Sequence, residues 1–204
     1  MTNSSTELNE LEYDLLTELF NIGVGRAAAS LSQMMKQEIN LSVPDITFCT
    51  VSTLIQHFNA SKNIITVTQD ISGPFDMKSM LVFPSDGSTE VIRAMLGDHL
   101  TEEMATELQQ EAFSEIGNII LNACIGIIAK TLDESFTIEL PSFSQDKPAA
   151  VFNENIADEN QVVMSMQVDL TLTTSAISGY IAFILGSVSL ENIKIQLNKM
   201  LNNV

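Results

Sequence analysis

The chain has 204 residues, with 26 acidic and nine basic side chains, a formal net charge of −17 and a hydrophobic fraction of 45%. So acidic a surface argues against nucleic acid and anionic membranes as partners, because both are bound through cationic patches. The hydrophobic fraction is ample for a continuous core, so we expect a self-folding protein whose partners present basic faces.

The amino-terminal residues lack the positive and apolar regions of a signal peptide. The longest apolar runs, near 116–129 and 176–186, are too short to span a bilayer. Cys49 and Cys124 each lie alone in an apolar segment, which favours buried thiols in a reducing compartment. We therefore expect a cytoplasmic protein that does not insert into a membrane.

The chain divides into two halves with the same order of predicted elements. Apolar residues recur with a 3.6-residue period in the helices, and β-branched runs bounded by turn residues mark the strands. The first half has a helix at 8–37, a strand at 41–51, a short helix at 52–58, a hairpin of strands at 63–71 and 77–83, and a helix at 88–96 that ends at Gly97. The second half has a helix at 103–131, a strand at 135–144, a surface loop at 145–161, a hairpin of strands at 162–172 and 176–185, and a helix at 190–201.

Two helix-strand-hairpin-helix halves predict an α+β fold. We expect a single domain over residues 1–204, made of two repeats at about 8–98 and 103–203 that are related by a pseudo-twofold axis. The strands of both repeats should form one antiparallel sheet with the two long helices packed on it. Small residues on those helices, such as Gly23, would permit close packing.

A polar motif occurs once in each long helix, with the same spacing both times. Two acids lie four residues apart, an asparagine follows the second acid by three residues, and a proline follows the asparagine by 23 residues. The members are Asp14, Glu18, Asn21 and Pro44 in the first half and Glu111, Glu115, Asn118 and Pro141 in the second. Each member of the second copy therefore lies 97 positions after its counterpart.

On a helix turning by about 100° per residue, the acids and the asparagine of each copy fall within an arc of roughly 60°. We name them the first stripe (Asp14, Glu18 and Asn21) and the second stripe (Glu111, Glu115, Asn118 and Asn122). The rest of each helix is mostly apolar and should be buried, whereas ionised carboxylates are not buried unpaired. The stripes are therefore predicted to face solvent or a partner.

The doubled pattern Asp/Ser-x3-Glu-x2-Asn-x22-Pro resembles that of the CheC family of chemotaxis phosphatases, which is related to CheX and FliY, and the chain looks most like CheC. It departs from the family at Glu111, and at Phe20 and Ile120, where the family often has glycine. The resemblance implies an enzyme that hydrolyses the aspartyl phosphate of a CheY-like response regulator. It also implies CheD, a receptor deamidase, as a further partner.

The residue types of the stripes suit that chemistry. An asparagine carboxamide offers a donor and an acceptor and takes up no proton at neutral pH. Asn21 and Asn118 are therefore predicted to hold the attacking water in line, since phosphoryl transfer depends on positioning. Glu18 and Glu115 are predicted to pair with a cation of the partner, which the resemblance suggests is the lysine of the phosphorylation site. The predicted partner contacts are Asp14, Glu111 and Asn122.

Three alternatives compete with this hypothesis. A metal site is disfavoured, because two acids on an open helix face bind magnesium poorly; we expect no cofactor in this chain, and Mg²⁺ carried by the phosphorylated regulator. The run Gly23 to Ala28 fits a dinucleotide fingerprint, but it follows a helix where that fingerprint requires a strand. A non-catalytic module, a sink or scaffold for phosphorylated CheY that docks through the same stripes, stays open.

The two stripes are expected to be independent sites of unequal strength. Gly117 beside Asn118 should let a partner backbone approach more closely than Phe20 permits beside Asn21. We therefore expect the site at Asn118 to be the stronger one.

Overall fold

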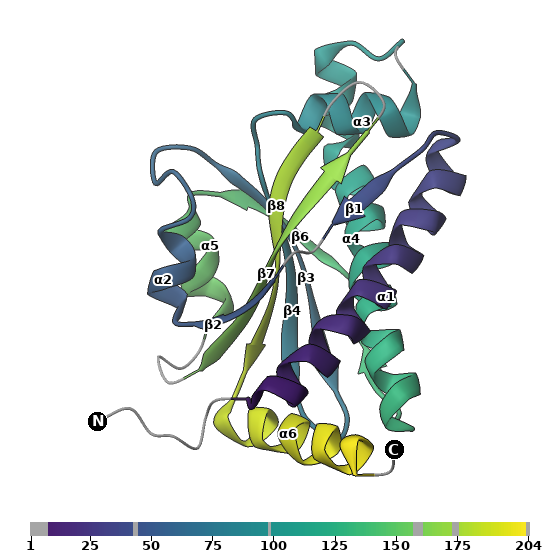
Figure 1. Cartoon of the computed structure of the whole chain (residues 1–204). Helices are drawn as coiled ribbons and strands as arrows, with labels where there is room; N and C mark the ends of the chain where they lie inside the picture. The colour runs from purple at the N-terminus through teal and green to yellow at the C-terminus, as the bar shows by residue number, and fades with distance from the viewer. Residues whose placement is uncertain (1–7, 43–44, 98, 157–160, 173–175, 203–204) are drawn as a thin grey trace.

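The computed structural model describes residues 8–42, 45–97, 99–156, 161–172 and 176–202 (Figure 1). In chain order the elements are α1 (Glu10–Met35), β1 (Asn40–Ser42), β2 (Ile46–Cys49), α2 (Val51–Ile55), β3 (Ile64–Ser72), β4 (Met77–Pro84), α3 (Ser88–Leu96), α4 (Glu102–Leu132), β5 (Thr137–Ile138), β6 (Ser142–Asp146), α5 (Pro148–Asn155), β7 (Val162–Thr171), β8 (Ala176–Leu185) and α6 (Ser187–Leu201).

The strands form one antiparallel sheet in which the two halves of the chain interleave. Its order is β1-β7-β8-β4-β3-β5, with β2 also paired to β7 and β6 to β3. The predicted hairpins, β3–β4 and β7–β8, form the centre and meet along β4 and β8. Each hairpin is flanked by strands of the other half, since β5 and β6 pair with β3 while β1 and β2 pair with β7.

The long helices α1 and α4 lie side by side on one face of the sheet and run in opposite directions, with α3 at one end of the molecule and α6 at the other (Figure 1). Beneath them, strand residues such as Val67, Leu81 and Phe183 form the larger core with Phe20 and Phe113 of the helices. The predicted α+β class, with one antiparallel sheet and two long helices packed on it, is confirmed.

The two helices pack closely against each other at Gly23. A Cβ there would lie 2.9 Å from the Cα of Cys124 in α4, closer than non-bonded carbon atoms rest. The prediction that small residues permit close packing is therefore confirmed at Gly23. At Gly25 and Gly126 an added Cβ would meet no atom of the described structure within 4 Å.

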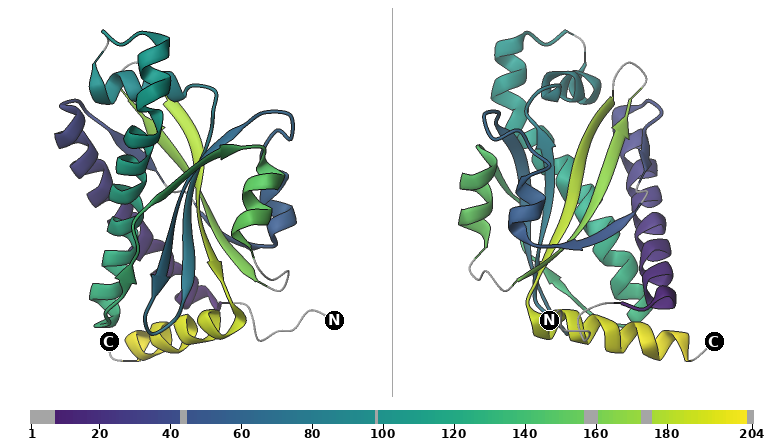
Figure 2. Two further views of the ribbon diagram at one scale, coloured as in Figure 1. Left: turned by 180° about the vertical axis from the view of Figure 1, so that it is seen from behind. Right: turned by 60° about the vertical axis from the view of Figure 1, so that its left-hand side comes forward.

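The opposite face of the sheet carries the two short helices α2 and α5 (Figure 2). Leu54 of α2 and Val151 and Phe152 of α5 are completely buried there, against sheet residues such as Met80 and Ala182. This smaller core uses the strand residues that point away from α1 and α4, as the alternation of side chains along a strand requires.

The predicted surface loop at 145–161 is wrong for most of its length. β6 runs on to Asp146, and α5 follows with Pro148 in its first turn, where proline presets the helical φ and its missing N–H costs no bond. The helix is stabilised by the apolar sheet surface that it covers. Residues 157–160 lie outside the described part of the chain.

The apolar surface of α4 belongs to the core. By length and composition, residues 102–131 would suffice to cross a membrane, and no other described helix meets that test; the prediction that every apolar run is too short is therefore wrong for α4. In the fold, 56% of its most apolar stretch is buried. Ile116, Ile120 and Cys124 have no measurable exposure.

Candidate functional site

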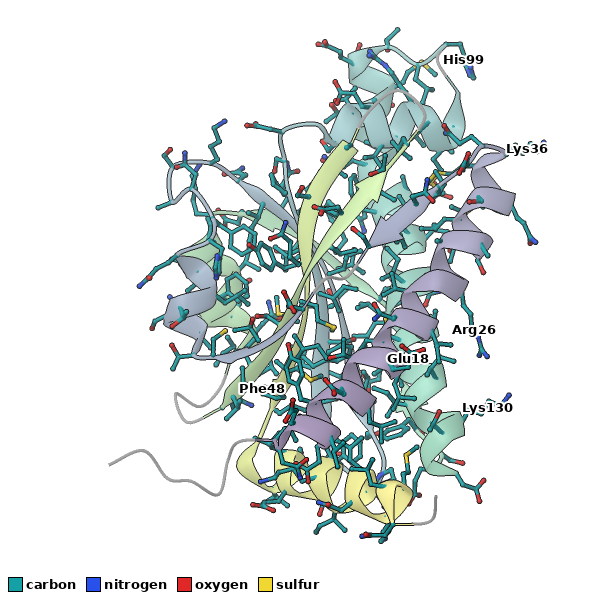
Figure 3. The ribbon with its side chains drawn as sticks, viewed as in Figure 1. Glu18, Arg26, Lys36, Phe48, His99 and Lys130 are labelled. Atoms are coloured by element: carbon teal, nitrogen blue, oxygen red, sulfur yellow. The ribbon has the colours of Figure 1, made fainter. Side chains whose placement is uncertain are left out.

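The first stripe lies on α1, whose start is fixed by a capping box. Asn9 Oδ1 accepts a hydrogen bond from the Glu12 backbone N–H at 3.0 Å, and Glu12 Oε2 accepts one from the Asn9 backbone N–H at 2.7 Å. The apolar side of the helix faces the sheet, so Asp14, Glu18 and Asn21 are all exposed (Figure 3, where Glu18 is labelled). The predicted exposure of the first stripe is confirmed.

The second stripe lies on α4, which begins at Thr101, whose hydroxyl accepts the Met104 backbone N–H at 3.3 Å. Glu111 and Glu115 are exposed, whereas Asn118 and Asn122 are half-buried. The acids of the second stripe therefore face solvent as predicted, while its two asparagines sit closer to the sheet.

The stripe carboxylates have no ion-pair partner among the described residues. Among the described residues the ion pairs are Lys62 with Asp86 and Lys78 with Asp70, and neither pair includes a stripe residue. No group of three or more described His, Cys, Asp or Glu side chains could hold a metal ion. The stripes are thus open acidic surfaces suited to a cationic partner.

Asn118 belongs to a small network of amides. Its Oδ1 accepts a hydrogen bond from Asn122 Nδ2 at 2.7 Å and another from Gln69 Nε2 at 3.2 Å. Gln69 Nε2 also donates to the backbone carbonyl of Glu139 at 3.2 Å. By contrast, the Asn21 side chain has no hydrogen-bond partner within the described ranges. Hydrogen bonds therefore hold the asparagine of the second motif in place, whereas the described residues provide none to the asparagine of the first motif.

The proline of the second motif marks a bulge beside this network. β5 pairs Ile138 with Ile71 and β6 pairs Ser142 with Thr68, so three residues at 139–141 oppose two at 69–70, which is a β-bulge. The predicted strand at 135–144 is thereby split at Pro141, which has no N–H to give to a ladder. Pro44, the proline of the first motif, lies outside the described residues.

A hollow of about 570 Å³ opens along the second stripe, between α3, α4 and Pro141. Glu111 and Glu115 line it together with apolar side chains that include Leu96 and Leu108. Pro141, the proline of the second motif, therefore lines the same hollow as both acids of that motif. An apolar hollow with an acidic rim suits a partner surface that combines apolar and basic side chains.

The residue before each asparagine faces the sheet, which corrects one prediction. Gly117 is buried, and an added Cβ would lie 2.5 Å from Cγ1 of Val67 in β3. Phe20 is also buried, with its ring centroid 5.3 Å from that of Phe183. Neither residue meets a partner, so the argument that Gly117 admits a partner backbone is wrong.

Gln69 is the member of the site that sequence reasoning missed. It lies on β3, 49 positions before Asn118, and is 2% exposed. A signal was present: Gln69 lies on the same face of the strand as Ile65, Val67 and Ile71, whose side chains point into the core. A polar side chain in such a buried phase requires hydrogen-bond partners.

Comparisons with known proteins agree with the family that the motif indicates. The model of the CheC-like family matches residues 11–47, which contain most of α1 and the first stripe. The CheY-P phosphatase CheC of Bacillus subtilis (strain 168) is 23% identical over 159 residues, covering 76% of this chain and 76% of that protein.

Two solved structures show the same fold. The crystal structure of Thermotoga maritima FliY has a TM-score of 0.76 at 17% identity and covers 95% of this chain and 98% of that one. The crystal structure of the CheX–CheY–BeF3–Mg²⁺ complex from Borrelia burgdorferi has a TM-score of 0.54 at 16% identity, covering 83% of this chain and 97% of the matched chain. From the family model, the curated relative and the shared fold together, the predicted resemblance to the CheC-like family is confirmed.

Proposed function

We propose that this protein hydrolyses the aspartyl phosphate of a CheY-like response regulator, with Glu18 and Asn21 in one site and Glu115 and Asn118 in the other. The observation that carries the proposal is the recurrence of Glu-x-x-Asn on two helices of one fold, with the glutamate exposed in both copies. The similarity to a CheY-P phosphatase, and the fold shared with a CheX solved together with CheY, support this choice of substrate.

The reaction needs positioning more than it needs a strong base. The water oxygen bonds to phosphorus while the bond from phosphorus to the aspartyl oxygen breaks, so that aspartate leaves as a carboxylate. The proton of the water ends on inorganic phosphate. Because the transition state is loose, holding the water in line supplies much of the rate. A carboxamide that keeps its protons at neutral pH suits that task.

The acids of the stripes would bind the partner. Glu18 and Glu115 lie one helical turn from the asparagines and have no ion-pair partner within the described chain, so each can meet a lysine at the phosphorylation site. Asp14 and Glu111 extend the same acidic faces by a further turn. The hollow beside Glu111 gives the second site an additional apolar contact.

Further components of the reaction come from outside this chain. We assign Mg²⁺ to the phosphorylated regulator, because the stripes are open faces with too few ligands for an octahedral ion. CheD is proposed as a second partner on the resemblance, without a surface assigned to it. The reaction is proposed to take place in the cytoplasm, where the regulator would be found.

Release of inorganic phosphate from the phosphorylated regulator tests the proposal. Wild-type protein at low stoichiometry should accelerate release, and Asn21→Ala combined with Asn118→Ala should abolish the acceleration while the circular dichroism spectrum stays native. If the sites are independent, the residual accelerations of the two single variants sum to that of the wild type. Gln33→Ala, an exposed change elsewhere on α1, is the matched control and should keep the full rate.

The non-catalytic alternative gives the opposite result in the same assay. A sink for the phosphorylated regulator would slow its decay in proportion to the amount of protein added. Slower decay, or a double variant that is as fast as the wild type, would refute catalysis by the two asparagines.

A further inference from the structure

We propose that Gln69 is a positioning residue of the second site and that, together with Asn122, it turns Asn118 so that the NH2 group of that carboxamide meets the phosphorylated partner. The inference rests on the proposed function and specifies how one of its two sites works.

The hydrogen bonds determine which end of the Asn118 carboxamide faces outward. Its Oδ1 receives Asn122 Nδ2 at 2.7 Å and Gln69 Nε2 at 3.2 Å. A carboxamide oxygen has two lone pairs, so both are occupied by protein donors. The two N–H bonds of Asn118 are left without an acceptor among the described residues, and its Nδ2 is not one of the buried polar atoms that lack a partner, so this end of the half-buried side chain is accessible.

Gln69 is itself held in place by the bulge at Pro141. The bulge frees the Glu139 carbonyl from the strand ladder, and this carbonyl accepts the second N–H of Gln69 at 3.2 Å. Because Gln69 is 2% exposed, its side chain has little freedom to reorient. The role of the proline would thus be to place the bulge whose free carbonyl holds Gln69, which explains why it follows the asparagine at a fixed distance.

Packing alone does not account for a glutamine at this position. Gln69 Oε1 and Asn122 Oδ1 are both buried without a hydrogen-bond partner in the described structure, and such atoms destabilise a fold. An apolar side chain would avoid that cost. The presence of two amides at these positions is therefore better explained by their hydrogen bonds to Asn118.

At the first site, the position equivalent to Gln69 carries an apolar side chain. β6 pairs with β3 in the same way that β2 pairs with β7. The pair Phe143–Val67 of the first of these ladders is equivalent to the pair Ile46–Met166 of the second. Counting two residues along each strand, Gln69 corresponds to Val168, which is fully buried. Asn122 corresponds to Gly25, which has no side chain. Both holding groups are thus absent from the first site.

The chemistry of the second site follows from this orientation. Asn118 Nδ2 donates to one lone pair of the attacking water and leaves the other lone pair for phosphorus. The exposed Glu115 carboxylate, one turn earlier, continues to dock the partner. A carboxamide held in advance saves the cost of orienting it during the reaction.

A kinetic test isolates the second site in the Asn21→Ala background. Adding Gln69→Leu should lower kcat about tenfold with little change in KM, because the docking acids are untouched. Thr68→Val is the matched control: it removes a hydrogen bond to the Ser142 carbonyl (3.5 Å) from the neighbouring residue of the same strand and should leave kcat unchanged. An unchanged kcat in the Gln69 variant, or an equal loss in the Thr68 variant, overturns the inference.

The donor role has its own variant. In Asn118→Asp the carboxylate keeps both accepted hydrogen bonds but has no N–H to present. In the Asn21→Ala background it should be as inactive as Asn118→Ala. Activity that survives in Asn118→Asp would show that an oxygen suffices and would overturn the donor role.

A spectroscopic test needs no partner. In the isolated protein, the heteronuclear NOE of the Asn118 side-chain amide should be as high as that of the α4 backbone, and should drop in Gln69→Leu, while Asn21 is low in both. Equal mobility of Asn118 and Asn21 in the wild type overturns the inference. If instead the wild type fails to release phosphate, the proposed function falls while this measurement still decides the role of Gln69.

A gain of function can be sought in the first site. Gly25 is exposed, and an added Cβ would meet nothing within 4 Å in the described structure, so Gly25→Asn can supply an amide one turn from Asn21. In the Asn118→Ala background it should raise the residual rate about twofold, whereas Gly25→Ala should not. No rise, or an equal rise in the alanine variant, overturns the role given to Asn122.

Discussion

Replacing Gly117 with alanine should move α4 away from β3 and disable the second site alone. The added Cβ would lie 2.5 Å from Cγ1 and 2.6 Å from Cβ of Val67, whereas non-bonded carbon atoms rest at roughly 3.5–4.0 Å. Helix and strand must therefore separate by about 1 Å. The bond from Gln69 Nε2 to Asn118 Oδ1, now 3.2 Å, would stretch to about 4 Å and be lost.

The expected loss of stability is moderate. Overpacking typically lowers the free energy of unfolding by about 1–3 kcal/mol, and the better helix propensity of alanine offsets about 0.5–1 kcal/mol of that. Urea unfolding should therefore show Gly117→Ala to be about 1–2 kcal/mol less stable than wild type. The second-site rate should fall about tenfold, as expected for Gln69→Leu, while the first site on α1 is untouched, so the total rate of phosphate release should approach that of Asn118→Ala.

Gly126→Ala provides the matched control on the same helix. An added Cβ there meets no described atom within 4 Å, so we expect a gain of about 0.5–1 kcal/mol and an unchanged rate. If Gly117→Ala is as stable as wild type and keeps the second-site rate, α4 does not depend on the close approach to Val67, and the reasoning is refuted.

Two further predictions concern charge and burial. Glu18→Gln with Glu115→Gln should raise KM for the phosphorylated regulator and weaken the salt dependence of the rate, because exposed charges are screened over about 8 Å at physiological ionic strength; an unchanged salt dependence from stopped-flow measurements would remove their docking role. Burial raises the pKa of the Cys124 thiol from 9.0 to about 12, so this thiol should resist iodoacetamide at pH 8 until the protein unfolds. Because the unfolded chain releases that proton at lower pH than the folded one, the thiol should lower the free energy of unfolding as pH rises above 9, a slope that Cys124→Ala lacks in alkaline urea titrations.

The long helices and both hairpins could be predicted because each carries a long, regular pattern of its own. α1 spans Glu10–Met35 against a predicted 8–37, and α4 spans Glu102–Leu132 against a predicted 103–131. α5 could not be predicted in this way. It has eight residues, and short helices are marginal unless tertiary contacts stabilise them; here those contacts are Val151 and Phe152 on the smaller core.

The candidate site was predictable only to the extent that it is local in sequence. The acids and asparagines share one helix face, so their spacing alone brings them together. Gln69 reaches Asn118 across 49 residues, and that contact depends on strand register and on the one-residue bulge at Pro141. Spacing located the proline beside the motif, but nothing local to the helix indicated that the bulge frees a carbonyl for a glutamine.

The difference between the two sites originates beneath the motif. Phe20 and Gly117 are counterparts, both buried on the sheet side of their helices. The ring of Phe20 occupies the space between α1 and the sheet and packs 5.3 Å from that of Phe183, so α1 stays further out and Asn21 remains exposed. Gly117 fills no such space, and α4 settles onto Val67 closely enough that no Cβ would fit. A helix this close to the sheet places Asn118 within reach of Gln69, so the buried residue before each asparagine, together with the side chains beneath it, decides whether that asparagine is held.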